Sequence, residues 1–230
     1  MYRIWQKLFA EFIGTFFFVF FSTSAICVDE ALRSGGTAGL GSIGIALVRG
    51  LTFAILVCAL AHISGAHFNP AITIGFWVTR RLGSIQALLY GVAQILGAIT
   101  GAYTVARFVP QQAWRAVLMG TPDLATGFSR TQGIFLEGLL TLFLVFVFFG
   151  AVATAKDSSA RFGGFAAGFA IFAGAVVGSP YTGASMNPAM ALGTAIVAHH
   201  WANHGVYWAG PLLGGVIGAW VYQILFVREP

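Results

Sequence analysis

The stretches that decide the fold of this chain are SGAHFNPA at residues 64–71 and TGASMNPA at residues 182–189. Each ends in Asn-Pro-Ala, a helix-start signal, because Asn caps a helix well and Pro suits the first helical position. The apolar stretches that follow, about 69–79 and 187–197, are too short to span a bilayer. The residues before each Asn-Pro-Ala are non-helical by composition, and irregular backbone at membrane depth must line a cavity or be buried in protein. We therefore expect two half-helices that begin inside the membrane.

Six longer apolar stretches surround the two short ones, and each has the roughly 20 residues that a membrane span needs. The composition agrees, since 58% of the residues are hydrophobic and only 8% are charged, whereas a soluble domain has about 25% charged residues. The sequence therefore predicts an all-α membrane protein whose residues 1–230 form one transmembrane domain. The expected spans are about 8–28, 42–63, 84–106, 132–154, 160–181 and 204–227.

The two halves of the chain repeat. Glu137 follows Glu11 by 126 positions, and Asn187 follows Asn69 by 118 positions. Because each half has three spans, an odd number, the second copy must be inverted in the membrane, and inverted repeats place their site near the midplane where broken helices meet. The predicted repeats cover approximately 8–106 and 132–227.

Basic residues predict the orientation. If the N-terminus is cytoplasmic, seven basic residues lie on the cytoplasmic side and four on the outer side, as the positive-inside rule favours. Both termini are therefore expected in the cytoplasm, and the net charge of +5 is assigned to topology and lipid headgroups rather than to nucleic acid. The short loops suggest a prokaryotic inner membrane. The cytoplasmic group is Arg3, Lys7, Arg80, Arg81, Lys156, Arg161 and Arg228, and the outer group is Arg33, Arg107, Arg115 and Arg130.

The starts of the half-helices carry the expected chemistry. A helix N-terminus has unpaired N–H groups and about half a positive charge, so two of them at the midplane repel cations. Asn69 and Asn187 can each cap a helix and offer an N–H to a passing molecule, which interrupts a continuous proton wire. Carbonyl groups of the preceding segments would line the path as acceptors. These lining residues are Gly65, Ala66, His67, Thr182 and Gly183.

The stretches at residues 64–71 and 182–189 look like the two signature loops of the aquaporin, or major intrinsic protein, family. The sequence resembles this family over essentially the whole chain. The resemblance implies six tilted helices and two half-helices around one pore, usually in a homotetramer. Glu11 and Glu137 match two buried glutamates that accept hydrogen bonds from the pore-loop backbones, although a membrane carboxylate is functional by default and a proton relay stays open. The pore motifs are Asn69, Pro70, Ala71, Asn187, Pro188 and Ala189.

The departures from the family concern its selectivity filter. Water-selective members carry an arginine directly after the second Asn-Pro-Ala, where this chain has Met190. The family's aromatic position, twenty residues before Asn69, is Arg49, so the arginine has moved to the opposite wall. The complete predicted filter is Arg49, Ala175, Ala184 and Met190.

Arg49 is also unusual when the family resemblance is set aside, because it lies about eight residues inside an apolar span. A buried charge there faces a cavity or a partner, and the alternative is a side chain that reaches back to the lipid headgroups.

The first functional hypothesis is a passive channel that conducts water and small neutral solutes and excludes ions and protons. Two alanines in the filter favour an alternative, a wide-filter facilitator for ammonia, urea, glycerol or similar solutes, whereas Ala191 replaces the Asp of the glycerol branch. An ion-coupled transporter would need Glu11 or Glu137 to titrate, and a structural junction protein would have a nearly closed pore.

We expect no enzymatic activity, because no catalytic triad, phosphate loop or metal-ligand spacing is visible, and we expect neither cofactor nor metal. The expected partners are membrane lipids, water, small neutral solutes and further copies of the chain. Three outer histidines are either solvated loop residues or a pH or metal gate. They are His199, His200 and His204.

Overall fold

The computed structural model describes residues 2–153 and 162–227. Six helices there are long and apolar enough to cross a membrane, and they include α1 and α6, which open the two repeats. The fold class is confirmed. The basic residues Lys156, Arg161 and Arg228 of the orientation argument lie outside the described part. The six long helices are α1 (Ile4–Ser34), α2 (Gly41–Ser64), α4 (Ser84–Phe108), α6 (Arg130–Phe148), α7 (Gly163–Thr182) and α9 (Val206–Phe226).

The two half-helices are α3 (Pro70–Val78) and α8 (Pro188–Ala198). Each begins at the proline of its Asn-Pro-Ala motif, with the asparagine as N-cap. Both helices therefore begin where the sequence signal predicts.

The boundaries differ from the prediction at three places. Helix α1 has 31 residues and extends past the apolar stretch. The connection between α4 and α6 contains the short helices α5 (Gln111–Ala116) and η1 (Leu118–Gly120), which the sequence did not predict. After Phe148 the chain continues as the π-helical segment η2 (Phe149–Ala153), and such wider turns occur often at functional sites.

The long helices pack closely in pairs. The most extensive pairs are α6 with α9, α1 with α4, and α2 with α7. The first two pairs lie each within one repeat, whereas α2 and α7 join the two repeats. A Cβ added at Gly50 of α2 would lie 2.7 Å from the carbonyl oxygen of Gly168 in α7, so these two backbones meet without intervening side chains.

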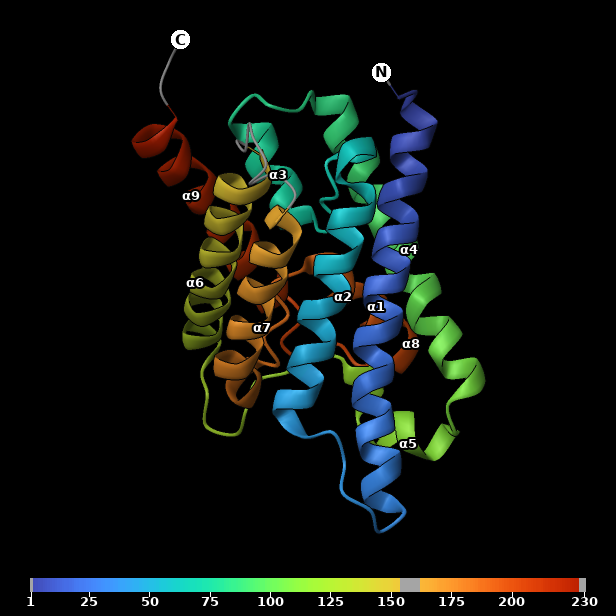
Figure 1. Ribbon diagram of the computed structural model, residues 1–230. Coiled ribbons are helices and arrows are strands. Elements are labelled where there is room, and N and C mark those ends of the chain that lie inside the picture. The colour runs from blue at the N-terminus through green and yellow to red at the C-terminus, as the bar shows by residue number, and fades with distance from the viewer. Residues whose placement is uncertain (1, 154–161, 228–230) are drawn as a thin grey trace.

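The start of α1 and the end of α9 lie at the same end of the bundle (Figure 1). An even number of spans requires this arrangement. Figure 1 also shows α2 and α7 side by side at the front of the bundle. The segments 65–68 and 183–186, here called the first and second pore loops, connect α2 to Asn69 and α7 to Asn187.

Candidate functional site

The N-termini of the two half-helices meet at the centre of the molecule. Asn69 caps α3, because its Oδ1 accepts a hydrogen bond from the Ala71 N–H at 2.8 Å. Its Nδ2 donates to the Met186 carbonyl at 2.7 Å, across the boundary between the two repeats. Asn69 therefore stabilises its own helix and also holds the second pore loop.

Asn187 makes the reciprocal contacts. Its Oδ1 accepts from the N–H groups of Ala189 and Met190 at 3.0 and 3.3 Å, and its Nδ2 donates to the Phe68 carbonyl at 2.9 Å. A side-chain amide has two N–H donors, and in the described residues only one from each asparagine has an acceptor. The second N–H of each amide therefore has no acceptor among the described residues.

Glu137 organises the second pore loop. Its carboxylate accepts hydrogen bonds from the Thr182 hydroxyl at 2.7 Å and from the N–H groups of Ser185 and Met186 at 2.9 and 2.8 Å. The residue is completely buried. Because a buried charge is tolerated only when it is well bonded, this geometry favours the scaffold role over a proton relay.

Glu11 does the same for the first pore loop. It accepts from the Ser64 hydroxyl at 2.6 Å, from the N–H groups of His67 and Phe68 at 3.0 and 2.7 Å, and from the Gln94 amide at 2.8 Å. Gln94 also donates to the Thr73 hydroxyl at 2.9 Å. Gln94 was not among the site residues predicted from the sequence. The signal that could have indicated it is an amide side chain in an otherwise apolar span.

The two loops share one unusual backbone pattern. Ala66 and Phe68 in the first loop have φ values of 54° and 49°, and Ala184 and Met186 in the second have 48° and 50°. This left-handed region costs energy for residues other than glycine, and it persists where surrounding bonds fix the backbone. The hydrogen bonds to the two glutamates supply that restraint.

Arg49 reaches the second pore loop rather than the lipid. Its NH1 donates to the Gly183 carbonyl at 3.1 Å and its NH2 to the Ala184 carbonyl at 2.6 Å. Only 2% of the residue is exposed, which rules out a side chain that extends to the headgroups. Glu137 attracts the guanidinium electrostatically, and the Arg49 Nε is buried without a partner in the described residues.

The other predicted filter residues lie partly around Arg49. The Met190 Sδ is 4.0 Å from the Arg49 NH2, and Ala184 contributes the carbonyl named above. Ala175 is buried in α7. Tyr181, which could have narrowed the filter, instead packs against Phe128 with 5.5 Å between ring centroids. The Arg49 guanidinium therefore has the small Ala184 and the flexible Met190 as neighbours among the predicted filter residues.

The residues predicted to line the path make different contacts in the structure. Gly65 and Gly183 end α2 and α7 in the left-handed conformation. The Nδ1 of His67 lies 3.1 Å from the Thr73 hydroxyl oxygen. Thr182 directs its hydroxyl to Glu137, so only its backbone remains for the lining predicted from the sequence.

The outer histidines do not converge. The Nε2 of His200 lies 2.7 Å from Asp123 Oδ2, whereas His204 accepts a hydrogen bond from the Trp208 indole at 3.0 Å. Partial burial lowers the pKa of His204. No group of three potential metal ligands occurs in residues 2–153 and 162–227.

Asp123 ties the outer connection to the end of α8. Burial alone would raise the pKa of this carboxyl, but hydrogen bonds from Asn203, His200 and the Leu124 N–H outweigh it and hold the pKa below its ordinary value. The same connection is bonded to the last turn of α7, just before the second pore loop, since the Ala125 N–H donates to the Tyr181 carbonyl at 2.8 Å.

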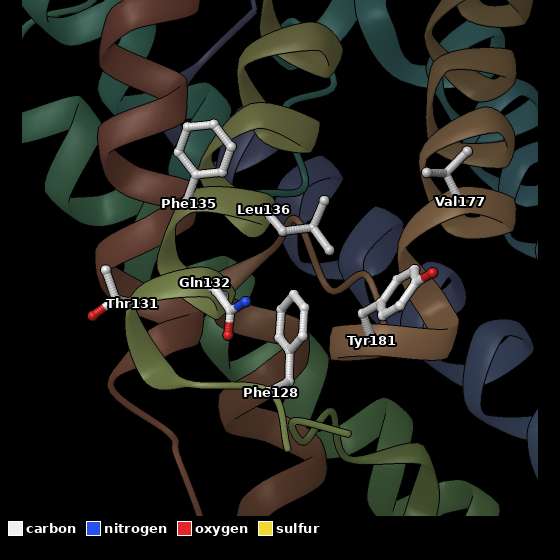
Figure 2. A pocket seen from close by; sticks show the side chains of 7 residues that line it. All are labelled: Phe128, Thr131, Gln132, Phe135, Leu136, Val177 and Tyr181. Atoms are coloured by element: carbon white, nitrogen blue, oxygen red, sulfur yellow. The ribbon is translucent and has the colours of Figure 1, made fainter. Parts of the chain in front are cut away.

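A hollow of about 460 Å³ opens between α6 and α7 at their outer surface (Figure 2). Apolar side chains dominate it, and Tyr181 and Phe128 close one end. It is separate from the residues around Arg49. The lining residues are Phe128, Thr131, Gln132, Phe135, Leu136, Val177 and Tyr181.

Comparison with known proteins gives consistent results. The family model for the major intrinsic protein matches residues 1–222. Nodulin-26 of Glycine max is 39% identical over 96% of this chain and 78% of its own length. The lens fiber major intrinsic protein of Lithobates pipiens is 37% identical over 99% and 84%, and aquaporin TIP4-4 of Zea mays is 35% identical over 97% and 88%.

Among solved structures, the aquaglyceroporin from Plasmodium falciparum superposes with a TM-score of 0.83 over 97% of both chains, at 22% sequence identity. At that identity the match shows the fold alone. These relatives come from plants and an animal, and another relative, aquaporin A of the amoeba Dictyostelium discoideum, is 33% identical over 97% of this chain and 79% of its own length. The expectation of a prokaryotic inner membrane, drawn from short loops, is therefore not supported.

Proposed function

As a member of the major intrinsic protein family, the chain is a multi-pass membrane protein and a passive channel for water and small solutes, and we propose that molecules cross it between Arg49 and the paired asparagines. Members of this family are channels, which fits a protein without enzymatic activity. The proposed path runs past Arg49 and the second pore loop, between Asn69 and Asn187, and on along the first pore loop.

The observation that carries this proposal is the fixed position of the Arg49 guanidinium. It is bonded to two carbonyl groups of the second pore loop, which hold the charge in one position. A fixed cation in a narrow, low-dielectric passage repels other cations. Arg49 thus performs, from α2, the task that an arginine at position 190 would perform from α8.

The paired asparagines add a second barrier to ions and protons. Two positive helix ends and two free amide N–H groups meet there, so a water molecule between them accepts hydrogen bonds and is turned away from its neighbours in a chain. We propose that this orientation excludes protons.

Water is the proposed main cargo. Ala175 and Ala184 leave room beside Arg49, which favours the alternative of a facilitator for ammonia, urea or glycerol. The ion-coupled transporter is disfavoured, because Glu11 and Glu137 already accept four and three hydrogen bonds from the protein.

The test is stopped-flow light scattering on proteoliposomes, together with an entrapped pH dye. We expect the wild-type protein to speed shrinkage in an impermeant sugar without speeding proton entry. Arg49→Ala should increase proton and cation leakage, and Met190→Arg in that background should reduce it again. Arg107→Ala is the matched control, because Arg107 lies near the Tyr103 ring at the end of α4. Equal leakage in wild type and Arg49→Ala would remove Arg49 from the filter.

We further propose a homotetramer with cytoplasmic termini. The outward face of α2 carries an exposed apolar ridge, and the hollow between α6 and α7 is an apolar recess that such a ridge fits. Native mass spectrometry tests the stoichiometry, and accessibility of terminal tags in right-side-out vesicles tests the orientation. The ridge residues are Ile43, Leu47, Leu51 and Ile55.

A further inference from the structure

Phe148 contacts three different walls of the proposed path. It is the last residue of α6 and is completely buried. Its ring centroid lies 6.4 Å from that of Phe53 in α2, 6.3 Å from His67 in the first pore loop, and 6.1 Å from Phe76 in α3. The His67 and Phe76 rings are themselves 4.2 Å apart. We call these four residues the aromatic collar.

The collar lies on the same face of α2 as Arg49. Arg49, Phe53 and Val57 follow one another at four-residue spacing, so they share one helix face, and all three are buried. At one end of this face Arg49 bonds the second pore loop. At the other end Phe53 contacts the Phe68 ring of the first pore loop, with centroids 6.1 Å apart. The face therefore continues past the paired asparagines into the collar.

The inverted repeat provides an internal comparison. Phe148 follows Glu137 by 11 positions, and Ser22 follows Glu11 by 11 positions. The same counting from each Asn-Pro-Ala asparagine pairs the residues two positions before it and seven positions after it. Three of the four collar rings correspond to small hydroxyl residues in the other repeat, whereas Phe53, sixteen positions before Asn69, corresponds to Ile171. The three pairs are Phe148 with Ser22, His67 with Ser185, and Phe76 with Thr194.

The three hydroxyl side chains are smaller and more polar than the rings to which they correspond. The Ser22 hydroxyl is buried without a partner in the described residues, and a buried polar group of this kind calls for a water molecule. Ser185 and Thr194 bond only nearby backbone carbonyls. The side of the second pore loop thus carries small hydroxyl side chains at positions where the side of the first carries rings.

The end of α6 is held in place from outside. The Arg81 guanidinium carbon lies 5.5 Å from the centroid of the Phe149 ring, and its Nε and NH2 donate to the Gln223 side chain of α9 at 3.1 and 2.8 Å. The Phe148 backbone is fixed between this contact and the preceding turns of α6.

We propose that Phe148 sets the size limit of the pore, so that water passes the aromatic collar while solutes of the size of urea and glycerol are held back, even though two alanines widen the filter at Arg49. The proposal rests on the proposed path between Arg49 and the paired asparagines. It makes Phe148 the residue that decides between a water channel and a small-solute facilitator.

The experiment compares four proteins in the same proteoliposomes: wild type, Phe148→Ala, Phe148→Leu and the control Phe146→Leu. Phe146 lies on the same helix and contacts Tyr222 and Phe226 of α9 instead of the collar. Re-swelling in urea and glycerol is measured beside shrinkage in sucrose, and reconstituted protein is quantified. Phe148→Leu guards against loss of folding, because it removes the ring but less side-chain volume than Phe148→Ala, and the cost in stability grows with the cavity left behind.

We expect both Phe148 variants to raise urea and glycerol permeability, the alanine variant about tenfold or more, a change that corresponds to about 1.4 kcal/mol of barrier. Water permeability should change much less, and Phe146→Leu should behave as wild type. Unchanged solute permeability in both Phe148 variants, beside normal water flow, would overturn the size limit alone. Solute permeability that rises with Arg49→Ala but not with the Phe148 variants would also overturn it. A wild-type protein that conducts neither water nor solutes would instead refute the proposed path.

Discussion

Replacing Glu137 by Gln should destabilise the second pore loop by a predictable amount. One carboxylate oxygen accepts from Met186 N–H, and the other accepts from Ser185 N–H and the Thr182 hydroxyl. Whichever way the amide turns, its NH2 group faces at least one backbone N–H, which loses its acceptor. A buried donor without a partner costs about 1–3 kcal/mol.

Glu137→Ala extends the same reasoning. The Thr182 hydroxyl can turn to the Gly178 carbonyl, 3.4 Å away, so two backbone N–H groups remain without acceptors. Their cost is roughly 2–6 kcal/mol, about twice that of the Gln variant. In a chain of this size each kcal/mol lowers the melting temperature by about 2–4 °C.

The assay is thermal unfolding in detergent, followed by tryptophan fluorescence, with Glu30→Gln as control. The Glu30 carboxylate receives the Ser34 hydroxyl in the last turns of α1 and touches no pore loop. We expect the order wild type, Glu137→Gln, Glu137→Ala in decreasing stability, with Glu30→Gln at the level of wild type. A Glu137→Gln variant as stable as wild type would refute the scaffold role and reopen a titrating role for this carboxyl.

Two further predictions concern packing and pH. A Cβ at Gly168 would collide with the Gly50 carbonyl, so Gly168→Leu should lower stability in the same thermal assay by at least about 1–3 kcal/mol. The control is Gly91→Leu, which should leave stability unchanged, because a Cβ at Gly91 meets nothing within 4 Å. Equal losses of stability in the two variants would contradict the close approach of α2 and α7. The pKa of Asp123 is lower in the folded state than in the unfolded state. The contacts of its carboxylate therefore stabilise the fold fully above the unfolded-state pKa of about 3.9. This stabilisation is lost as the pH falls through the folded-state pKa. Below about pH 4 the melting temperature of wild type should therefore fall more steeply than that of Asp123→Asn, and parallel pH curves would show that the Asp123 contacts contribute nothing.

Much of the architecture could be predicted from local signals. The half-helices follow from Asn-Pro-Ala, since the asparagine side chain caps the helix and the proline has no N–H to satisfy. Arg49 was found because a charge inside an apolar span must have partners, and its partners proved to be carbonyl groups of a segment far away in the sequence.

Phe148 could not be found in this way. The chain has 22 phenylalanines, many of them facing outward, and nothing in the sequence distinguishes a ring inside the path from one in lipid. Its role depends on the packing of α6 against three other segments. The π-helical end of α6 and the hydroxyl of Thr182 were missed for the same reason, because both are settled by tertiary contacts.

The 4.0 Å between Arg49 NH2 and Met190 Sδ limits which side chains can stand together at positions 49 and 190. An arginine at position 190 beside Arg49 would bring two cations close together. At a separation of about 4 Å their repulsion is about 4 kcal/mol with an effective dielectric constant near 20. A single arginine, on either wall, avoids this repulsion. The site therefore accommodates one arginine more readily than two.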